Sequence, residues 1–150
     1  MRDTNYSPIS FRMACAFVCG ILFFLSGCSA QHRDDFPWEQ DYQTAIQESQ
    51  KSGKPLFIMM TADWCGPCKK LERDTLSDPK VRDFMKAFVS VKAYEDEKVE
   101  KKYGYNGYPT LVIADKKGEK VYKFSGYRPP GPFIKEISNA YKELGLKLPK

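Results

Sequence analysis

Apolar residues along the chain alternate between the spacing of a helix and the length of a buried strand. The first helical stripe is formed by Trp38, Tyr42, Ala45, Ile46 and Ser49. Gly53 and Pro55 end this helix. The next apolar run, Leu56 to Met60, is continuous and has the length of a strand, which indicates a strand covered on both faces. A helix followed by a buried strand therefore opens the folded part of the sequence.

The rest of the chain continues this alternation. After a helix that reaches about Leu71–Thr75, Ser77-Asp78-Pro79 caps a further helix. Phe88–Ala93 is predicted as a second strand, parallel to the first because helices connect the two. The remaining elements are a short helix at Val99–Tyr103, two strands at Thr110–Ala114 and Lys120–Phe124 joined by Asp115-Lys116-Lys117-Gly118, and a closing helix with Phe133, Ile134, Ile137, Tyr141 and Leu144. This order predicts an α/β domain with a mixed four-stranded sheet and helices on both faces.

The first 27 residues have the pattern of an export signal. Arg2 and Arg12 precede an apolar run from Met13 to Leu25, which is shorter than the roughly 20 residues that span a bilayer as a helix. The run ends in Leu25-Ser26-Gly27-Cys28, which resembles a bacterial lipobox. That resemblance implies cleavage before Cys28 and a lipid on its sulfur. The alternatives are an ordinary cleaved signal or an uncleaved anchor, in which Cys28 has no role.

These features divide the chain into three parts. We expect residues 1–27 to be a lipoprotein signal peptide that is removed, residues 28–37 a lipidated tether, and residues 38–150 one folded domain. Such a protein would be exported and anchored to a membrane by its lipid, facing the periplasm. The net charge of +5 is spread over mixed basic and acidic residues, without a basic stripe that includes aromatic residues. Nucleic acid is therefore not expected as a partner.

Processing would leave two free thiols among the five cysteines of the chain. The first two leave with the signal and Cys28 carries lipid, so Cys65 and Cys68 remain. Two cysteines separated by two residues form a reversible disulfide, and a helix that begins there stabilises the thiolate that attacks other disulfides. A zinc site needs four ligands, and the single histidine, His32, lies in the polar tether. We therefore expect dithiol–disulfide exchange and no metal.

Three motifs in this order of elements resemble the thioredoxin fold. They are Trp64-Cys65-Gly66-Pro67-Cys68-Lys69 between a strand and a helix, Tyr108-Pro109-Thr110 before a hairpin, and Gly126 after it. The resemblance covers roughly residues 38–145. It is closest to exported thioredoxin-like proteins that are similar to the C-terminal periplasmic domain of transmembrane disulfide reductases. The implied fold class is α/β, a thioredoxin fold built on the mixed four-stranded sheet.

The residues of the CxxC motif have roles that follow from their chemistry and from the resemblance. Cys65, expected to be exposed at the helix N-terminus, would attack as a thiolate, and Cys68 would resolve the mixed disulfide. Gly66 would let a partner approach closely. Pro67 suits a first helical turn, where no N–H is needed. Trp64 has two open interpretations: it shields the disulfide, or it is a core aromatic residue.

The resemblance also assigns the segment around Pro109. It implies a cis bond between Tyr108 and Pro109 that packs against the CxxC sulfurs. Because proline has no N–H to donate to a strand ladder, the backbone of Tyr108 would be free to pair with an extended substrate. Gly126 would line the same groove. Without the resemblance, Pro109 would be interpreted as the start of an edge strand.

One position departs from thioredoxins proper, which carry a buried aspartate six residues before the first cysteine. Met59 stands at that position here, and Asp63 lies in the turn, nearer the surface. Resolution by Cys68 would then depend on water or on Asp63.

Together these inferences predict a membrane-tethered thiol-disulfide oxidoreductase without a cofactor. Its Gly-Pro dipeptide is shared with thioredoxin, whose potential of about −270 mV favours a reductase of protein disulfides. The partners would be exported proteins with disulfides and a membrane thiol relay that supplies reducing equivalents. A periplasmic disulfide oxidase or isomerase is the alternative within this chemistry. A tethered binding or assembly factor without turnover is the alternative outside it.

Overall fold

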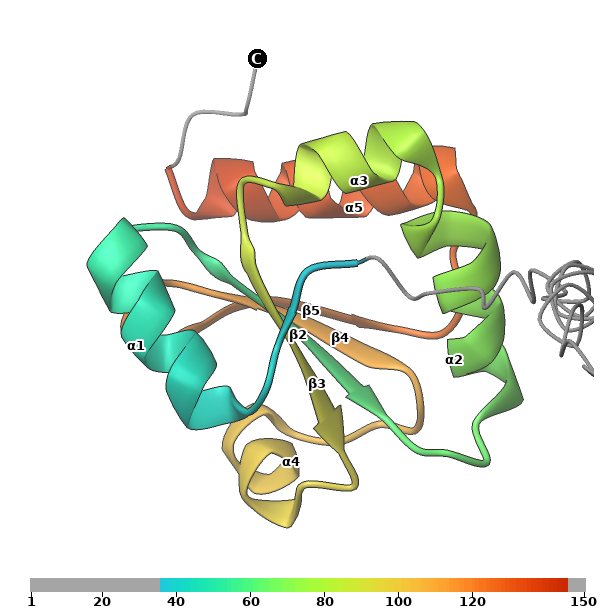
Figure 1. Ribbon diagram of the computed structural model, residues 1–150, viewed down its shortest axis with the longest axis horizontal. Coiled ribbons are helices and arrows are strands. Elements are labelled where there is room, and N and C mark those ends of the chain that lie inside the picture. The colour runs from blue at the N-terminus through green and yellow to red at the C-terminus, as the bar shows by residue number, and fades with distance from the viewer. Residues whose placement is uncertain (1–35, 146–150) are drawn as a thin grey trace, which may run out of the picture. The chain divides into compact units, whose positions relative to one another are not determined.

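The computed structural model describes residues 36–145, which alternate between strands and helices (Figure 1). The elements in chain order are β1 (Trp38–Glu39), α1 (Tyr42–Ser52), β2 (Leu56–Thr61), α2 (Gly66–Leu71), the π-helical segment η1 (Glu72–Leu76), α3 (Pro79–Met85), β3 (Val89–Tyr94), α4 (Glu97–Tyr103), β4 (Thr110–Ala114), β5 (Lys120–Ser125) and α5 (Pro130–Glu143). All the elements expected from the sequence are present, and β1 is an addition.

The central strand of the sheet is β2. The strand order is β1-β3-β2-β4-β5. β1 and β2 both run parallel to β3, whereas β4 is antiparallel to β2 and to β5. All six residues of β2 are buried, which confirms that this strand is covered on both faces. The sheet is therefore mixed, as predicted, but it has five strands rather than four.

The additional strand, β1, contains a residue that the apolar pattern assigned to the first helix. Trp38 is extended and pairs with Ser90 of β3. Helix α1 begins only at Tyr42 because Asp41 caps it: the Asp41 carboxylate accepts the backbone N–H of Thr44 at 2.9 Å. The prediction of a helical Trp38 is therefore wrong. A capping residue in the middle of the apolar stripe was the local signal for the true start of the helix.

Helices cover both faces of the sheet, as predicted, and each face has its own core (Figure 1). α3 and α5 lie over one face, and α1 and α4 lie over the other. The first core contains three phenylalanines in ring contact, Phe57, Phe124 and Phe133. It also contains Phe36, which the sequence placed in the tether and which is only 6% exposed. The packed domain thus includes a residue before β1.

The segment after β2 forms three successive helical pieces. The chain leaves the carboxyl end of β2, enters α2, continues into η1 and then begins α3. Asp78 caps α3 and Pro79 opens it, which confirms the helix start predicted at Ser77-Asp78-Pro79. Within residues 36–145, no helix is both long and apolar enough to cross a membrane.

Candidate redox site

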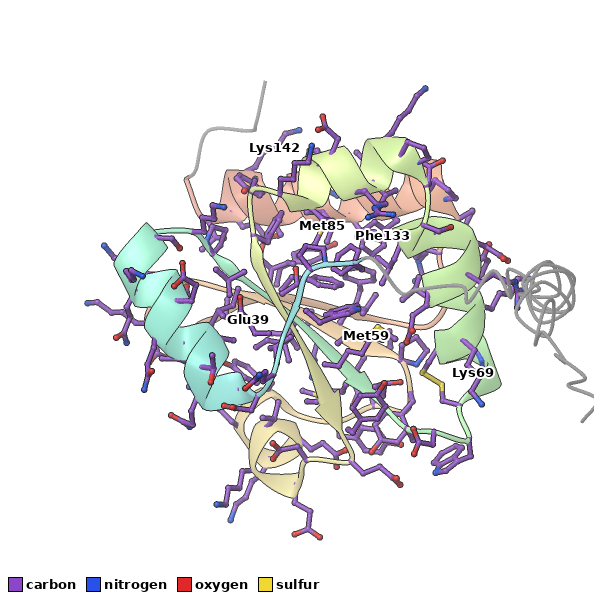
Figure 2. The ribbon with its side chains drawn as sticks, viewed as in Figure 1. Glu39, Met59, Lys69, Met85, Phe133 and Lys142 are labelled. Atoms are coloured by element: carbon purple, nitrogen blue, oxygen red, sulfur yellow. A yellow bond between two sulfur atoms is a disulfide. The ribbon has the colours of Figure 1, made fainter. Side chains whose placement is uncertain are left out.

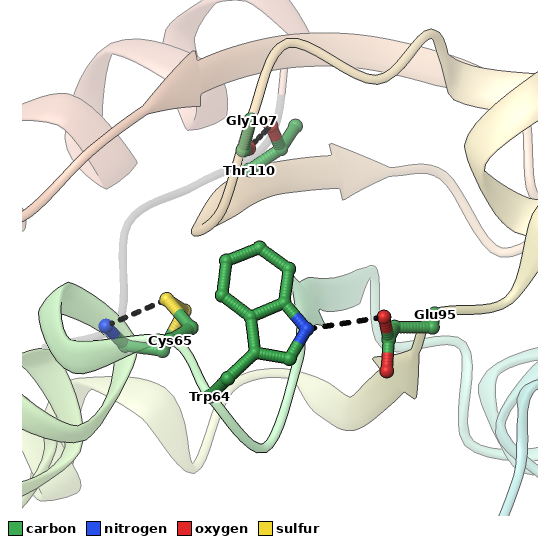
Figure 3. The surroundings of a disulfide bond; sticks show 6 residues. Trp64, Cys65, Glu95, Gly107 and Thr110 are labelled. Atoms are coloured by element: carbon green, nitrogen blue, oxygen red, sulfur yellow. Dashed lines mark hydrogen bonds between the residues drawn. A yellow bond between two sulfur atoms is a disulfide. The ribbon is translucent and has the colours of Figure 1, made fainter.

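Cys65 and Cys68 form a disulfide at the start of α2 (Figure 3). Their Cα atoms are 5.3 Å apart. Cys65 is the N-cap of the helix, and its Sγ accepts the backbone N–H of Cys68 at 3.1 Å. Pro67 lies in the first turn, where a residue without an N–H fits. In the dithiol form, the same N–H and the helix dipole would stabilise a thiolate on Cys65.

Both cysteines are buried in the disulfide form. Cys65 is 2% exposed and Cys68 is 1% exposed, so the expectation of an exposed Cys65 is wrong for this state. The covalent bond holds the Cys65 sulfur against Cys68, and both residues belong to one core cluster. The space beside Gly66 is open: apart from its chain neighbours and the backbone of its own helix, no heavy atom lies within 4 Å of a Cβ position built on Gly66.

Trp64 is an exposed side chain beside the disulfide. Its exposure of 69% contradicts the interpretation as a core residue. The indole ring lies edge-on to the Tyr108 ring, with centroids 5.6 Å apart. Its Nε1 donates a hydrogen bond to Oε1 of Glu95 at 3.2 Å (Figure 3). Trp64 therefore links the CxxC turn to the segments that follow β3 and precede β4.

The structure brings Tyr108, Pro109 and Gly126 together beside this turn. The Tyr108–Pro109 peptide bond is cis, as the resemblance implied. Gly126 has a φ of +84°, in the region that favours glycine, and donates its N–H to the Pro109 carbonyl at 2.8 Å. Among the described residues outside helices and strands, no backbone–backbone hydrogen bond involves Tyr108. Pairing of the Tyr108 backbone with an extended substrate therefore stays a prediction.

Met59 is fully buried in the core cluster that contains both cysteines (Figure 2). A thioether neither accepts nor donates a proton in catalysis, so this position offers Cys68 no general base. Asp63 is exposed in the turn before Trp64.

Replacing Met59 with aspartate is expected to accelerate the resolution step by about tenfold or more, because a buried carboxylate would accept the Cys68 proton. The measurement is a single-turnover assay of mixed-disulfide decay near neutral pH. Met60→Asp is the matched control, since Met60 is equally buried but belongs to the core of the other face. Circular dichroism would show that both variants are folded. An unchanged decay rate in folded Met59→Asp would contradict the prediction.

Two residues of the site were missed by the sequence reasoning, Glu95 and Glu100. Glu95 accepts the Trp64 indole N–H, and Glu100 accepts the hydroxyl hydrogen of Tyr108. Among residues 36–145, Glu95 is the only non-glycine residue with a positive φ, at +44°. Its placement depends on tertiary contacts, so no local pattern predicts it. The available signal was that an exposed tryptophan N–H and a nearby tyrosine O–H need acceptors.

Several predictions concern residues that the structure does not describe. The signal peptide at 1–27, the lipidation site Cys28, most of the tether and His32 lie outside residues 36–145. Within the described part of the chain, no group of three or more histidine, cysteine, aspartate or glutamate side chains is placed to hold a metal ion.

A family model described as a thioredoxin-like domain matches residues 42–141. The chain belongs to the thioredoxin-like domain family. The thioredoxin fold expected from the motifs is therefore confirmed, and the Cys65–Cys68 pair places the domain among thiol-disulfide oxidoreductase-type domains.

Three individual proteins are similar to parts of this chain. The thiol:disulfide interchange protein DsbD of Yersinia pestis is 34% identical over 76 residues, which cover 47% of this chain and 13% of that protein. The chain thus matches only a small part of this relative. A thioredoxin from Thermus thermophilus superposes with a TM-score of 0.59 at 28% identity, covering 65% of this chain and 82% of that chain. The reduced C-terminal domain of Neisseria meningitidis DsbD shares the fold, with a TM-score of 0.56 at 24% identity over 65% of this chain and 92% of that domain.

Proposed function

We propose that this protein reduces disulfides of exported proteins by dithiol exchange at Cys65 and Cys68. The observation that carries the proposal is the Cys65–Cys68 disulfide at a helix start, beside the unpaired Tyr108 backbone. The similarity to DsbD, a thiol:disulfide interchange protein, supports the same chemistry. Trp64, Gly66, Pro67, Tyr108, Pro109 and Gly126 would form the groove that positions the client.

The reaction proceeds in two exchange steps. The Cys65 thiolate attacks one sulfur of the client disulfide, so that a Cys65–client bond forms and the other client sulfur leaves as a thiolate. The Cys68 thiol then gives its proton to water or to Asp63 and attacks the Cys65 sulfur as a thiolate, so that the Cys65–client bond breaks and the second client sulfur leaves as a thiolate. The client gains two electrons and the domain ends as the Cys65–Cys68 disulfide. During both steps the extended client segment would pair with the backbone of Tyr108.

The reductive direction requires a source of electrons outside the domain. A membrane thiol relay of the kind found in transmembrane disulfide reductases would return the Cys65–Cys68 disulfide to the dithiol. An anchor on Cys28 would keep the domain close to that relay, and the export signal would place both on the periplasmic side of the membrane. The lipid, the membrane location and the donor are thus parts of one proposal.

The test compares the two directions of exchange. The reduced protein is mixed with an oxidised peptide, and the oxidised protein with the same peptide in its dithiol form. A reductase converts the first mixture nearly completely and the second hardly at all, as measured by alkylation and mass mapping of Cys65 and Cys68. Efficient oxidation of the dithiol peptide would contradict the reductive assignment and favour an oxidase or isomerase.

A further inference from the structure

Three aromatic rings form a continuous strip that begins next to Cys65. We define this aromatic strip as Trp64, Tyr108 and Tyr105. The Trp64 and Tyr108 ring centroids are 5.6 Å apart, and those of Tyr108 and Tyr105 are 4.7 Å apart. Trp64 is 69% exposed and Tyr105 is 43% exposed. Large apolar side chains are seldom left this exposed in groups unless they contact a partner.

Two carboxylates hydrogen-bond to residues of the strip. Glu95 accepts the indole N–H of Trp64, and Glu100 accepts the hydroxyl hydrogen of Tyr108. Burial, the hydrogen bond to Glu100 and the negative charges of Glu100 and Glu95 raise the pKa of Tyr108. Although they hydrogen-bond to different residues, both carboxylates therefore act electrostatically on Tyr108. Glu95 holds its position in spite of a strained backbone, with a φ of +44°.

Three lysines that are near the strip in the sequence have contacts or cavity positions outside it. On α4, Lys98 and Lys102 line a cavity against α1, and Lys102 Nζ donates to the Tyr42 hydroxyl at 2.9 Å. Glu100 occupies the other flank of α4, where it meets Tyr108. Nζ of Lys70, two residues after Cys68, lies over the ring of Tyr127 at 4.5 Å from its centroid. The strip thus faces solvent with two bound carboxylates and without these amines.

This arrangement favours the binding of a cation against the faces of the aromatic rings. The face of an aromatic ring carries negative electrostatic potential and attracts ammonium and guanidinium groups. A carboxylate that accepts a ring N–H or O–H polarises the ring further, because hydrogen-bonded groups polarise one another. An arginine side chain would gain most, since its planar guanidinium stacks on aromatic faces.

We propose that the aromatic strip binds a lysine or arginine side chain next to the reacting cysteine of the client, so that disulfides with a basic neighbour are reduced preferentially. The inference rests on the proposed function and names its substrate class. Glu95 and Glu100 are the residues that set this specificity, whereas Cys65 and Cys68 carry the exchange.

The experiment uses the reduced full-length protein and three oxidised peptides that differ only at the residue beside the cysteine: arginine, glutamine or glutamate. Each rate is divided by the rate of the same peptide with dithiothreitol, which removes the effect of the neighbour on the intrinsic reactivity of the disulfide. We expect the arginine peptide to react about five- to tenfold faster than the glutamate peptide at low salt. High salt should reduce this ratio, because it screens exposed charges.

The variants remove charge while retaining hydrogen-bond acceptors. In Glu95→Gln/Glu100→Gln, the ratio of arginine to glutamate rates should fall below about twofold. Glu136→Gln is the matched control, since Glu136 accepts the hydroxyl hydrogen of Tyr122 in the same way but on α5; its ratio should stay at the wild-type value. Equal normalised rates in the wild type, or an unchanged ratio in the double variant, would overturn the preference for basic neighbours. Neither result would contradict the proposed function. If no peptide reacts faster than with Cys65→Ser, the proposed function itself fails.

Discussion

Replacing Cys65 with serine is expected to reduce the rate of disulfide exchange to that of a protein-free control. A serine hydroxyl does not form the nucleophilic anion near neutral pH, whereas a thiolate at a helix N-terminus does. The serine side chain fits at the N-cap of α2, so the fold should be retained. The measurement is the reduction rate of an oxidised peptide, with circular dichroism to show that the variant is folded.

A second variant distinguishes the roles of the two cysteines. Cys68→Ser should still attack but not resolve, so a mixed disulfide between Cys65 and the client should accumulate and be recovered by mass spectrometry under non-reducing conditions. Cys28→Ser serves as the control with an unaltered redox pair. The same variants test the alternative of a binding or assembly factor: if cells that carry Cys65→Ser show the wild-type phenotype, turnover is not the function.

Replacing Phe133 with alanine is expected to lower the free energy of unfolding by about 3–5 kcal/mol. Phe133 is fully buried on α5, and its ring centroid lies 6.0 Å from that of Phe57 on β2 and 6.1 Å from that of Phe124 on β5. The alanine would leave a cavity where α5 meets the sheet. Urea unfolding followed by fluorescence measures the change.

A neighbouring position provides the control for this stability prediction. Lys135 is exposed on the same helix, and Lys135→Ala should change the free energy of unfolding by less than about 0.5 kcal/mol. A loss of less than about 1 kcal/mol in Phe133→Ala would show that this aromatic contact does not hold α5 on the sheet.

Most of the fold could be predicted from the sequence because the strongest patterns of the sequence are local. The apolar run of β2, the cap at Asp78 and the order of helices and strands are all determined by neighbouring residues, and the structure contains them. β1 was missed because its two residues gain their structure from pairing with β3. Two residues are too few for a periodic pattern.

The site could be predicted only in part. The spacing of Cys65 and Cys68 indicated their disulfide, but the cis bond at Pro109 came from the family resemblance, because spacing alone does not distinguish cis from trans. The prediction that Cys65 is exposed was wrong because its burial is set by tertiary packing around the closed disulfide. Glu95 lies 31 residues after Trp64 in the sequence, and only the fold brings the two side chains together.

The most direct test of the reductase account is the equilibrium redox potential of the Cys65–Cys68 pair. The protein is equilibrated with mixtures of reduced and oxidised dithiothreitol or glutathione, and the fraction of the disulfide is read by alkylation and mass mapping of the two cysteines. A potential of about −270 mV or below is the result expected for a reductant. A potential above about −180 mV would contradict it and assign the domain to disulfide formation or isomerisation.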